Sequence, residues 1–386
     1  MKLGFLNINT VSLAHALIFE RFFEEILFFS ENQNDVHLLN TKFFKTNQTD
    51  LQHKLLYSQK ITASTDPVEV INKSDILLCY EDCKLSSDNF IDISPVLEQI
   101  QKFYLSSHVD ISLYGKKFVV LSTLNFGDSK IIEERINQFG IEYCYCPLFI
   151  NEDSVLESLE KTELLLLGSI HNSLADQIYK LYSDIKKVKI KTFILPPSSV
   201  EIAKLSITAL QASKMVIKNT VGDLLISSGL KNEINSIFDV LNTQIVEKDN
   251  VTKFGLNYGG PNISKEMNSL SEFSKTKKVE KNIFEFIDLV NEEHFQFIKH
   301  YYLELNKDKS IPFIIESLGY KKYSDNLENS QRLKLCLELL NEGYEVNVIE
   351  SNPQIIEKLS SLSESYENRL KFFSRDSKVD GFRIEL

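Results

Sequence analysis

The stretch Leu3–Phe19, LGFLNINTVSLAHALIF, decides the fold of the first part of the chain. A short apolar run, LGFLNI, leads into a polar turn and then into apolar residues at helical spacing, which predicts a strand, a turn and an amphipathic helix. Such an order is typical of the start of a dinucleotide-binding sheet. Three glycines usually make that turn, and here Asn7, Asn9 and Ser12 stand in their places.

This turn can be interpreted as an ordinary strand-turn-helix or as a dinucleotide site. Asn tolerates a left-handed backbone and Ser is small, so the turn can form, but the side chain of Asn9 occupies space that a pyrophosphate needs. The run DVHLLN is interpreted as the second strand, and it ends at Asn40, where a dinucleotide site carries an acidic residue for the ribose. The sequence therefore predicts a retained fold with a degenerate cofactor site.

Alternating apolar runs predict a doubly wound parallel sheet up to about residue 190. The interpretation places a helix over HALIFERFFEEILFF and strands at LGFLNI, DVHLLN, ILLCY, KFVVLST, IEYCYC and ELLLLG. From Ser198 a long helical stretch follows, and the later order PFIIE, LKLCLELLNEG and YEVNVIES predicts a second, smaller α/β unit. The expected fold is α/β, with two Rossmann-like parallel-sheet domains, 1–192 and 306–386, joined by a long helical dimerisation segment, 193–305.

The composition limits the possible partners and the compartment. The 386 residues allow two or three domains, and the net charge of −11 argues against broad contact with nucleic acid or an anionic membrane. The apolar runs are too short for a membrane span and the start does not resemble a signal peptide, so we expect a cytoplasmic protein. Cys144 and Cys146 face one side of a strand, which favours core packing over metal binding because no His cluster or CxxC pair accompanies them.

Six later segments carry a family resemblance, of which FGLNYGGPNISKEMNSL is the most specific. The others are VINKSDILLCYED, KKFVVLSTLNFGDSKIIEE, CPLFINEDSVLE, PPSSVEIAKLSITAL and IESLGYKKYSDNLENS. In order and spacing they resemble the motifs of the UDP-glucose/GDP-mannose dehydrogenase family, NAD-dependent enzymes that oxidise the C6 hydroxyl of a nucleotide-linked sugar to a carboxylate. The most specific segment resembles the family's Gly-Tyr-Gly-Gly-x-Cys-Phe-Pro-Lys-Asp motif, and the resemblance covers nearly the whole chain.

The resemblance implies a set of site residues and three departures. The family's nucleophilic cysteine is Asn262 here, its aspartate is Glu266, and the arginine of its terminal segment is Glu328. An amide cannot form the thioester of the family mechanism. The resemblance implies catalytic roles for Thr123, Glu152 and Lys204, and substrate contacts from Tyr258, Gly259, Gly260, Lys265 and Lys321. Outside such motifs, each lysine would be interpreted as a solvated surface residue.

Two hypotheses follow for the activity. The first is a pseudoenzyme of polysaccharide precursor metabolism that has lost the nucleophile and most of its affinity for NAD, and that keeps the fold for binding a UDP- or GDP-sugar, for regulation or for assembly. The second is an active oxidoreductase with altered chemistry that binds NAD in a distorted turn. In both, the family resemblance implies a homodimer built on the helix around Lys204–Leu225.

Overall fold

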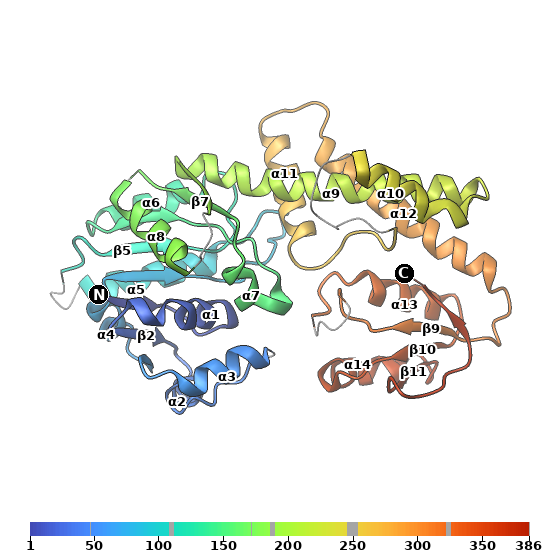
Figure 1. The fold of residues 1–386 in the computed structure, drawn as a ribbon, viewed down its shortest axis with the longest axis horizontal. Helices are drawn as coiled ribbons and strands as arrows, with labels where there is room; N and C mark the ends of the chain where they lie inside the picture. Colours follow the sequence, from blue (N-terminus) through green and yellow to red (C-terminus); the bar gives the residue numbers. More distant parts are fainter. Residues whose placement is uncertain are drawn as a thin grey trace. The chain divides into compact units, whose positions relative to one another are not determined.

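The computed structural model describes residues 1–46, 48–107, 112–170, 172–185, 190–244, 254–321 and 326–385 (Figure 1). Contacts divide the chain into two compact units, Met1–Lys204 and Leu205–Leu386. Because the division into 1–192, 193–305 and 306–386 concerns function as well as packing, it stays a prediction.

The first unit is built on an eight-stranded sheet with the strand order β3-β2-β1-β4-β5-β6-β7-β8. Neighbouring strands are parallel, except that β6 and β7 meet in an antiparallel pair of Tyr145 with Gly168. The central strands are buried on both faces, as expected of a parallel sheet covered by helices. The strands are β1 Lys2–Phe5, β2 Glu25–Phe29, β3 Ile61–Ser64, β4 Ile76–Cys79, β5 Lys117–Val120, β6 Glu142–Tyr145, β7 Leu164–Gly168 and β8 Lys191–Leu195.

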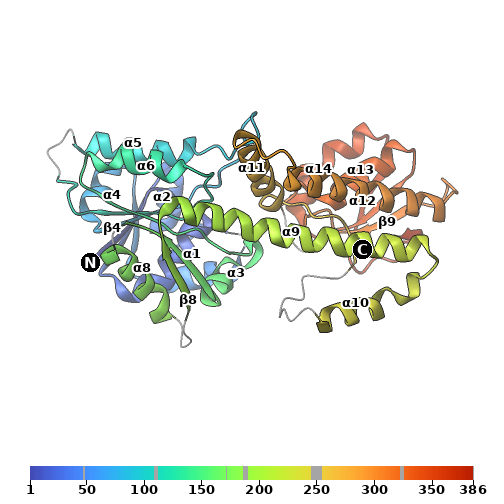
Figure 2. The ribbon, with the colours of Figure 1, turned by 90° about the horizontal axis from the view of Figure 1, so that it is seen from above.

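Helices cover both faces of this sheet, as Figure 2 shows. One group is α1 Thr10–Phe19 with α3 Thr49–Tyr57, α7 Val155–Glu160 and α8 Asn172–Ile185, which all contact α1. The other is α4 Pro67–Lys73, α5 Ser94–Ser107 and α6 Asp128–Asn137. Since its own neighbours and the sheet enclose it, α1 is buried on nearly every side rather than amphipathic as predicted.

A single long helix, α9 Pro197–Ser227, contains the boundary between the two units and confirms the helical stretch predicted there. In the second unit it is followed by α10 Ile234–Gln244, α11 Ile263–Thr276 and α12 Ile283–Leu305.

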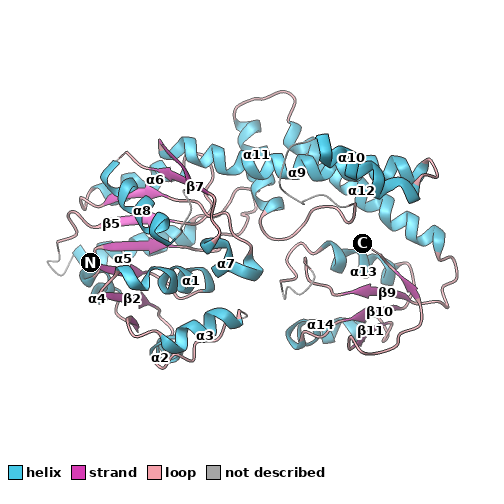
Figure 3. Ribbon diagram, viewed as in Figure 1, coloured by secondary structure: helices cyan, strands magenta, loops and turns pink. Residues whose placement is uncertain are grey.

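The second unit contains a four-stranded parallel sheet with the order β11-β10-β9-β12 (Figure 3). Its strands are β9 Phe313–Glu316, β10 Val346–Ile349, β11 Leu370–Phe373 and β12 Phe382–Arg383, with α13 Gln331–Asn341 and α14 Pro353–Ser365 between them. The order repeats that of β3-β2-β1-β4 in the first unit. Two Rossmann-like parallel sheets in one α/β chain are therefore confirmed.

The second strand was wrongly predicted. Residues 25–29, interpreted as the end of a helix, form β2 between β1 and β3, and DVHLLN lies in the helix α2 Gln33–Asn40. The run EILFF is fully apolar after its first residue, and periodicity cannot separate a doubly buried strand from a buried helix. The residues that follow the second strand are thus Ser30 and Glu31, and Glu31 is acidic.

Asn40 has a structural contact instead of a place in the cofactor site. Its carboxamide accepts from Ala63 N at 2.7 Å and donates to Ala63 O at 3.0 Å, so it pairs with the free edge of β3 as a strand would. Lys42 Nζ donates to the next carbonyl along that edge, Ile61 O. The prediction that Asn40 ends the second strand is wrong, and with it the reason for placing Asn40 at the ribose.

The cysteines bear out one smaller prediction. Cys144 and Cys146 are fully buried within the main core of the first unit, as core packing requires. Within the described ranges, each helix is too short or too polar to cross a membrane.

Candidate functional site

The loop after β1 lies at the point in the first sheet where the strand order reverses, between β2 on one side and β4 on the other. Ligands of such sheets bind outside the carboxyl ends of the strands at this point. Asn9 caps α1, since its Oδ1 accepts from Ser12 N at 2.8 Å, and Ser12 Oγ donates to Asn7 Oδ1 at 3.0 Å. Asn7, Asn9 and Ser12 thus form one hydrogen-bonded cluster.

The same cluster ties the β1 loop to the β4 loop. Asn7 Nδ2 and Asn9 Nδ2 both donate to Tyr80 O, at 2.5 and 3.0 Å. Neither asparagine has a positive φ, so the turn forms without the left-handed backbone that glycines usually supply. Side chains and a carbonyl of the protein itself therefore bridge the carboxyl ends of β1 and β4.

Around the neighbouring loops, polar residues mainly hold the backbone. Ser122 Oγ accepts from Glu81 N at 2.7 Å. Glu201 of α9 is fully buried and accepts from Gly127 N at 2.7 Å and Ser129 N at 2.6 Å, which fixes the start of α6. Burial raises the pKa of Glu201, while these two backbone donors oppose that shift.

Three predicted catalytic residues lie in the first unit. Lys204 is 7% exposed, and its ammonium lies 4.9 Å from the centroid of the Phe149 ring. Thr123 is half-buried directly after the β5 loop serine. Glu152 begins a short 3-10 turn, and its side chain lies outside the described residues.

In the second unit, α9 and α11 bring together the residues around the nucleophile position. Asn262 immediately precedes α11 and does not cap it with its side chain. Lys265 and Glu266, in the first turn of α11, are 5% and 1% exposed. Thr208 Oγ1 donates to Glu266 Oε2, so α11 is joined to the helix that carries the family's lysine motif.

The glycine motif is a loop that helix α12 holds in place. Asn291 accepts from Tyr258 N at 2.9 Å and donates to Tyr258 O at 3.0 Å, and the Tyr258 hydroxyl donates to Asp288. Burial raises the pKa of both Tyr258 and Asp288. Asp288 and Asn291 were not singled out in the sequence, although polar residues three apart on an otherwise apolar helix face could have indicated them.

Both glycines of the motif are required by packing. A Cβ on Gly259 would lie 2.3 Å from Asn329 O, and one on Gly260 would lie 2.5 Å from the Tyr320 ring, where φ is also +79°. Lys321 is exposed, with its ammonium 4.9 Å from the centroid of the same Tyr320 ring. Loop 258–260 and the segment after β9 therefore lie in contact.

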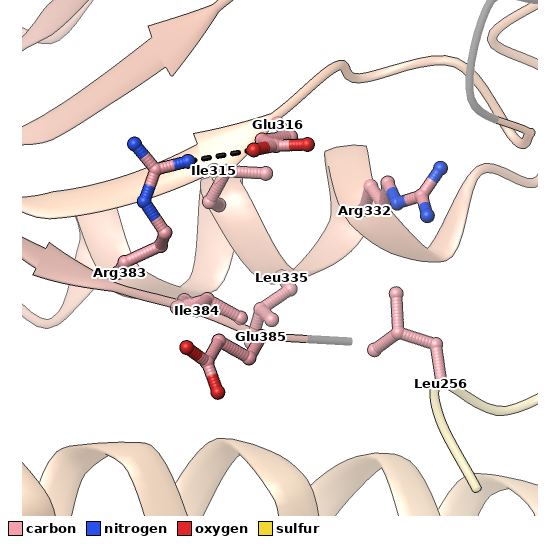
Figure 4. A pocket seen from close by; sticks show the side chains of 8 residues that line it. All are labelled: Leu256, Ile315, Glu316, Arg332, Leu335, Arg383, Ile384 and Glu385. Atoms are coloured by element: carbon pink, nitrogen blue, oxygen red, sulfur yellow. Dashed lines mark hydrogen bonds and ion pairs between the residues drawn. The ribbon is translucent and has the colours of Figure 1, made fainter.

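A cavity of about 310 Å³ lies beside this contact, and Figure 4 shows its lining. Its walls include Leu256, an apolar side chain each from β9 and α13, and Ile384 directly after β12. Arg383 pairs with Glu316 at 2.6 Å. Arg332, in the first turn of α13, has a buried Nη1 without a hydrogen-bond partner among the described residues. Burial lowers the pKa of Arg332, which nevertheless remains a cation. This residue, four positions after Glu328, was not singled out in the sequence.

The structure defines an α/β protein with two Rossmann-like sheets, each with a loop at the carboxyl end of its first strand. No protein-family model matches the chain. In sequence it is similar to the GDP-mannose 6-dehydrogenase of Pseudomonas putida, with 19% identity over 212 residues, 54% of this chain and 46% of the relative. It is also similar to the UDP-glucose 6-dehydrogenase of Pseudomonas aeruginosa, with 19% identity over 304 residues, 75% of this chain and 65% of the relative. Less than two thirds of either relative's length is matched.

The fold agrees with these sequence matches. A UDP-glucose dehydrogenase from the archaeon Pyrobaculum islandicum superimposes with a TM-score of 0.82 at 18% identity, covering 97% of this chain and 86% of that one. The chain is therefore similar to nucleotide-sugar 6-dehydrogenases in both sequence and fold, and the resemblance identified in the sequence is confirmed.

Proposed function

We propose that the chain binds a UDP- or GDP-sugar without oxidising it to the carboxylate, and that it has a binding or regulatory role in polysaccharide precursor synthesis. The observation that carries this proposal is Asn262 in the nucleophile position. A carboxamide cannot attack the aldehyde intermediate to form a thioester, and the step from aldehyde to acid needs that intermediate in the family mechanism. The catalytic roles that the resemblance gives to Thr123, Glu152, Lys204 and Glu266 remain proposals.

We also infer that NAD binds weakly or not at all. In a dinucleotide site the pyrophosphate lies against the N-terminus of the first helix, and its backbone N–H groups face the phosphate. Here Asn9 already accepts from Ser12 N, and the Asn7 and Asn9 amides bond Tyr80 O. The residues present at the phosphate position do not fit the group. Glu31 after β2 would still suit the ribose, so the inference rests on the phosphate loop alone.

The ligand-binding part of the proposal rests on the second unit. The backbone of the loop at Tyr258, Gly259 and Gly260 lies close to the segment after β9. The chain has lysines at positions 265 and 321, as the family motifs do. Arg332 adds a half-buried cation beside that loop, with a buried Nη1 that has no hydrogen-bond partner among the described residues. These cations suit the diphosphate of a nucleotide-sugar, for which guanidinium and ammonium groups are the usual partners.

A second candidate is an active oxidoreductase that makes a two-electron product with NAD on the same substrate class. The observation in its favour is that Lys204, Lys265 and Glu266 remain buried, since charged groups are seldom buried without a role or a partner.

Calorimetry with a panel of UDP- and GDP-sugars and with NAD and NADH separates the two candidates. The proposal expects nucleotide-sugar binding, weakened at least tenfold by Arg332→Ala and unchanged by Arg375→Ala, an exposed arginine of the same unit. It also expects no reduction of NAD at 340 nm. Reduced cofactor on mixing wild-type protein, NAD and a nucleotide-sugar would establish the second candidate, and no binding of any sugar in the panel would remove the first.

We further propose that segment 193–305 forms a homodimer through α9. Leu210, Ile217 and Leu224 are 63%, 63% and 62% exposed and lie seven residues apart, on one stripe of the helix. Light scattering at micromolar concentration should give a dimer for wild type and a monomer for Ile217→Asp. Ile131→Asp, on an exposed site of α6, is the control that keeps the dimer.

A further inference from the structure

Helix α12 holds the glycine loop at a third point, through His294. The Nε2 atom of His294 lies 2.7 Å from Gly255 O, and the Nδ1 atom lies 2.8 and 2.9 Å from the two carboxylate oxygens of Asp223 on α9. His294 is 3% exposed. Together with Asp288 and Asn291, it completes a row of polar side chains, three residues apart, that bonds to residues 255–258.

The contacts of His294 fix the number of protons that the pair must hold. A carbonyl oxygen only accepts, so Nε2 must carry a proton. The contact between Nδ1 and the carboxylate of Asp223 also needs one proton between its two atoms. With two protons, His294 and Asp223 together carry no net charge. If either proton is lost, two lone pairs face each other, either between Nε2 and Gly255 O or between Nδ1 and the Asp223 carboxylate, and both contacts are shielded from solvent.

Among the residues that the structure describes, a second histidine, His15, is also buried, and it has no such requirement. His15 on α1 has one ring nitrogen 2.8 Å from Val11 O and the other 2.9 Å from the hydroxyl of Tyr182. Because a hydroxyl can donate as well as accept, a neutral ring satisfies both contacts. Burial lowers the pKa of His15 to about 4, in agreement with a neutral imidazole.

The surroundings of His294 leave Asp223 as its charged partner among the described contacts. From the loop, the Phe254 ring packs edge-on against the imidazole at 5.7 Å, and Phe254 also fills the space over Gly222 of α9. On α12 itself, Glu292 and Glu293 are exposed, and Glu292 pairs with Lys334 of α13 at 2.6 Å. Burial raises the pKa of Asp223, and His294 opposes that shift.

We propose that Asp223 and His294 form a protonation-dependent positioning pair for the loop 254–260, and that the loop is held firmly only while the pair retains both protons. When the pair loses one of its two protons, the bond to Gly255 O or the bond to Asp223 is lost with it. The effect on ligand affinity rests on the proposed nucleotide-sugar site, whereas the effect on the loop itself does not.

Hydrogen exchange of the ligand-free protein tests the pair directly. The protection factors of the Tyr258 and Gly260 amides, corrected for intrinsic exchange rates, should fall roughly tenfold between about pH 5.5 and pH 8.5. In His294→Gln and Asp223→Asn the protection should be low at both pH values. The control His300→Gln changes an exposed histidine of the same helix and should retain the wild-type pH dependence.

A second measurement keeps the test independent of how well the variants fold. Ring ¹⁵N shifts of His294 in the wild-type protein should change over the same pH range as the protection of the loop amides. Constant protection and constant shifts over this range would overturn the proposal.

Titration with UDP at both pH values examines the ligand separately. If the pair also controls the ligand site, wild-type protein should bind UDP more weakly at pH 8.5 than at pH 5.5. In His294→Gln, the ratio of the two dissociation constants should be close to one. Failure of UDP to bind at either pH counts against the proposed function and leaves the exchange result to decide on the pair.

Discussion

The loop after β1 and the loop at Tyr258–Gly260 differ in what holds them. In the first, side chains of the loop bond each other and the neighbouring carbonyl of Tyr80, and no glycine remains. In the second, two glycines remain because backbone and ring atoms occupy the space of a Cβ, and α12 bonds the loop from behind. A glycine that packing requires is retained even if the catalytic activity is lost, whereas a glycine that only makes room for a ligand is not. Gly259 and Gly260 are therefore better evidence for the fold than for catalysis.

The strongest test of this difference is Gly259→Ala. The new Cβ would lie 2.3 Å from a backbone oxygen, so the loop must move, and we expect a loss of about 3 kcal/mol in the free energy of unfolding of the second unit. Gly255→Ala is the matched control, since its Cβ would have no atom within 4 Å, and it should cost under about 0.5 kcal/mol. Equal costs in urea unfolding would mean that packing does not explain the retained glycine.

The helix that follows the first loop carries the buried His15, and this histidine supplies the second test. Its pKa is lowered to about 4 in the folded state, against an ordinary value of 6.5, because burial disfavours the charged ring. The unfolded chain therefore binds the proton more tightly, and stability is lost as the pH falls from about 6.5 through about 4, by up to about 3 kcal/mol. Unfolding measured at several pH values should show a shallower slope for His15→Gln than for wild type, and an unchanged slope for His53→Gln, an exposed site on α3.

Asn9→Ala should have a smaller effect, confined to the first loop. It removes the cap on Ser12 N and the bond to Tyr80 O, for an expected loss of about 1.5 kcal/mol. Asn32→Ala removes an exposed cap of α2 with a single bond and should cost about 0.5 kcal/mol. If Asn9→Ala proves no more costly than Asn32→Ala in thermal unfolding, the side-chain cluster does not hold the loop.

Much of the fold could be predicted from the sequence, and the errors of that prediction have a common cause. The two sheets, the helix α9 and the family resemblance follow from periodicity and motif order. The run EILFF was placed in a helix because a doubly buried strand has no period of its own, and this misplaced the ribose position from Ser30 and Glu31 to Asn40. Asp288, Asn291 and His294 act through contacts with residues distant in sequence, and Arg332 is distinguished only by a buried donor. The pairing of distant residues and the burial of one atom are properties of the fold, which one sequence does not give.

The smallest expected effect is also the most informative, namely the effect of Asn262→Cys on turnover. If the nucleophile were the one missing part, the new thiol would complete the thioester route, and two NADH would form for each sugar oxidised. We expect no NADH, because the bonds from Asn7 and Asn9 to Tyr80 O would still bridge the cofactor loop, and the missing parts of one catalytic unit do not add back singly. Asn262→Ser, with the same backbone change and a poorer nucleophile, is the control. If Asn262→Cys forms NADH and Asn262→Ser does not, the first loop still binds the cofactor. The two loops would then differ in how they are packed and not in whether they bind a ligand.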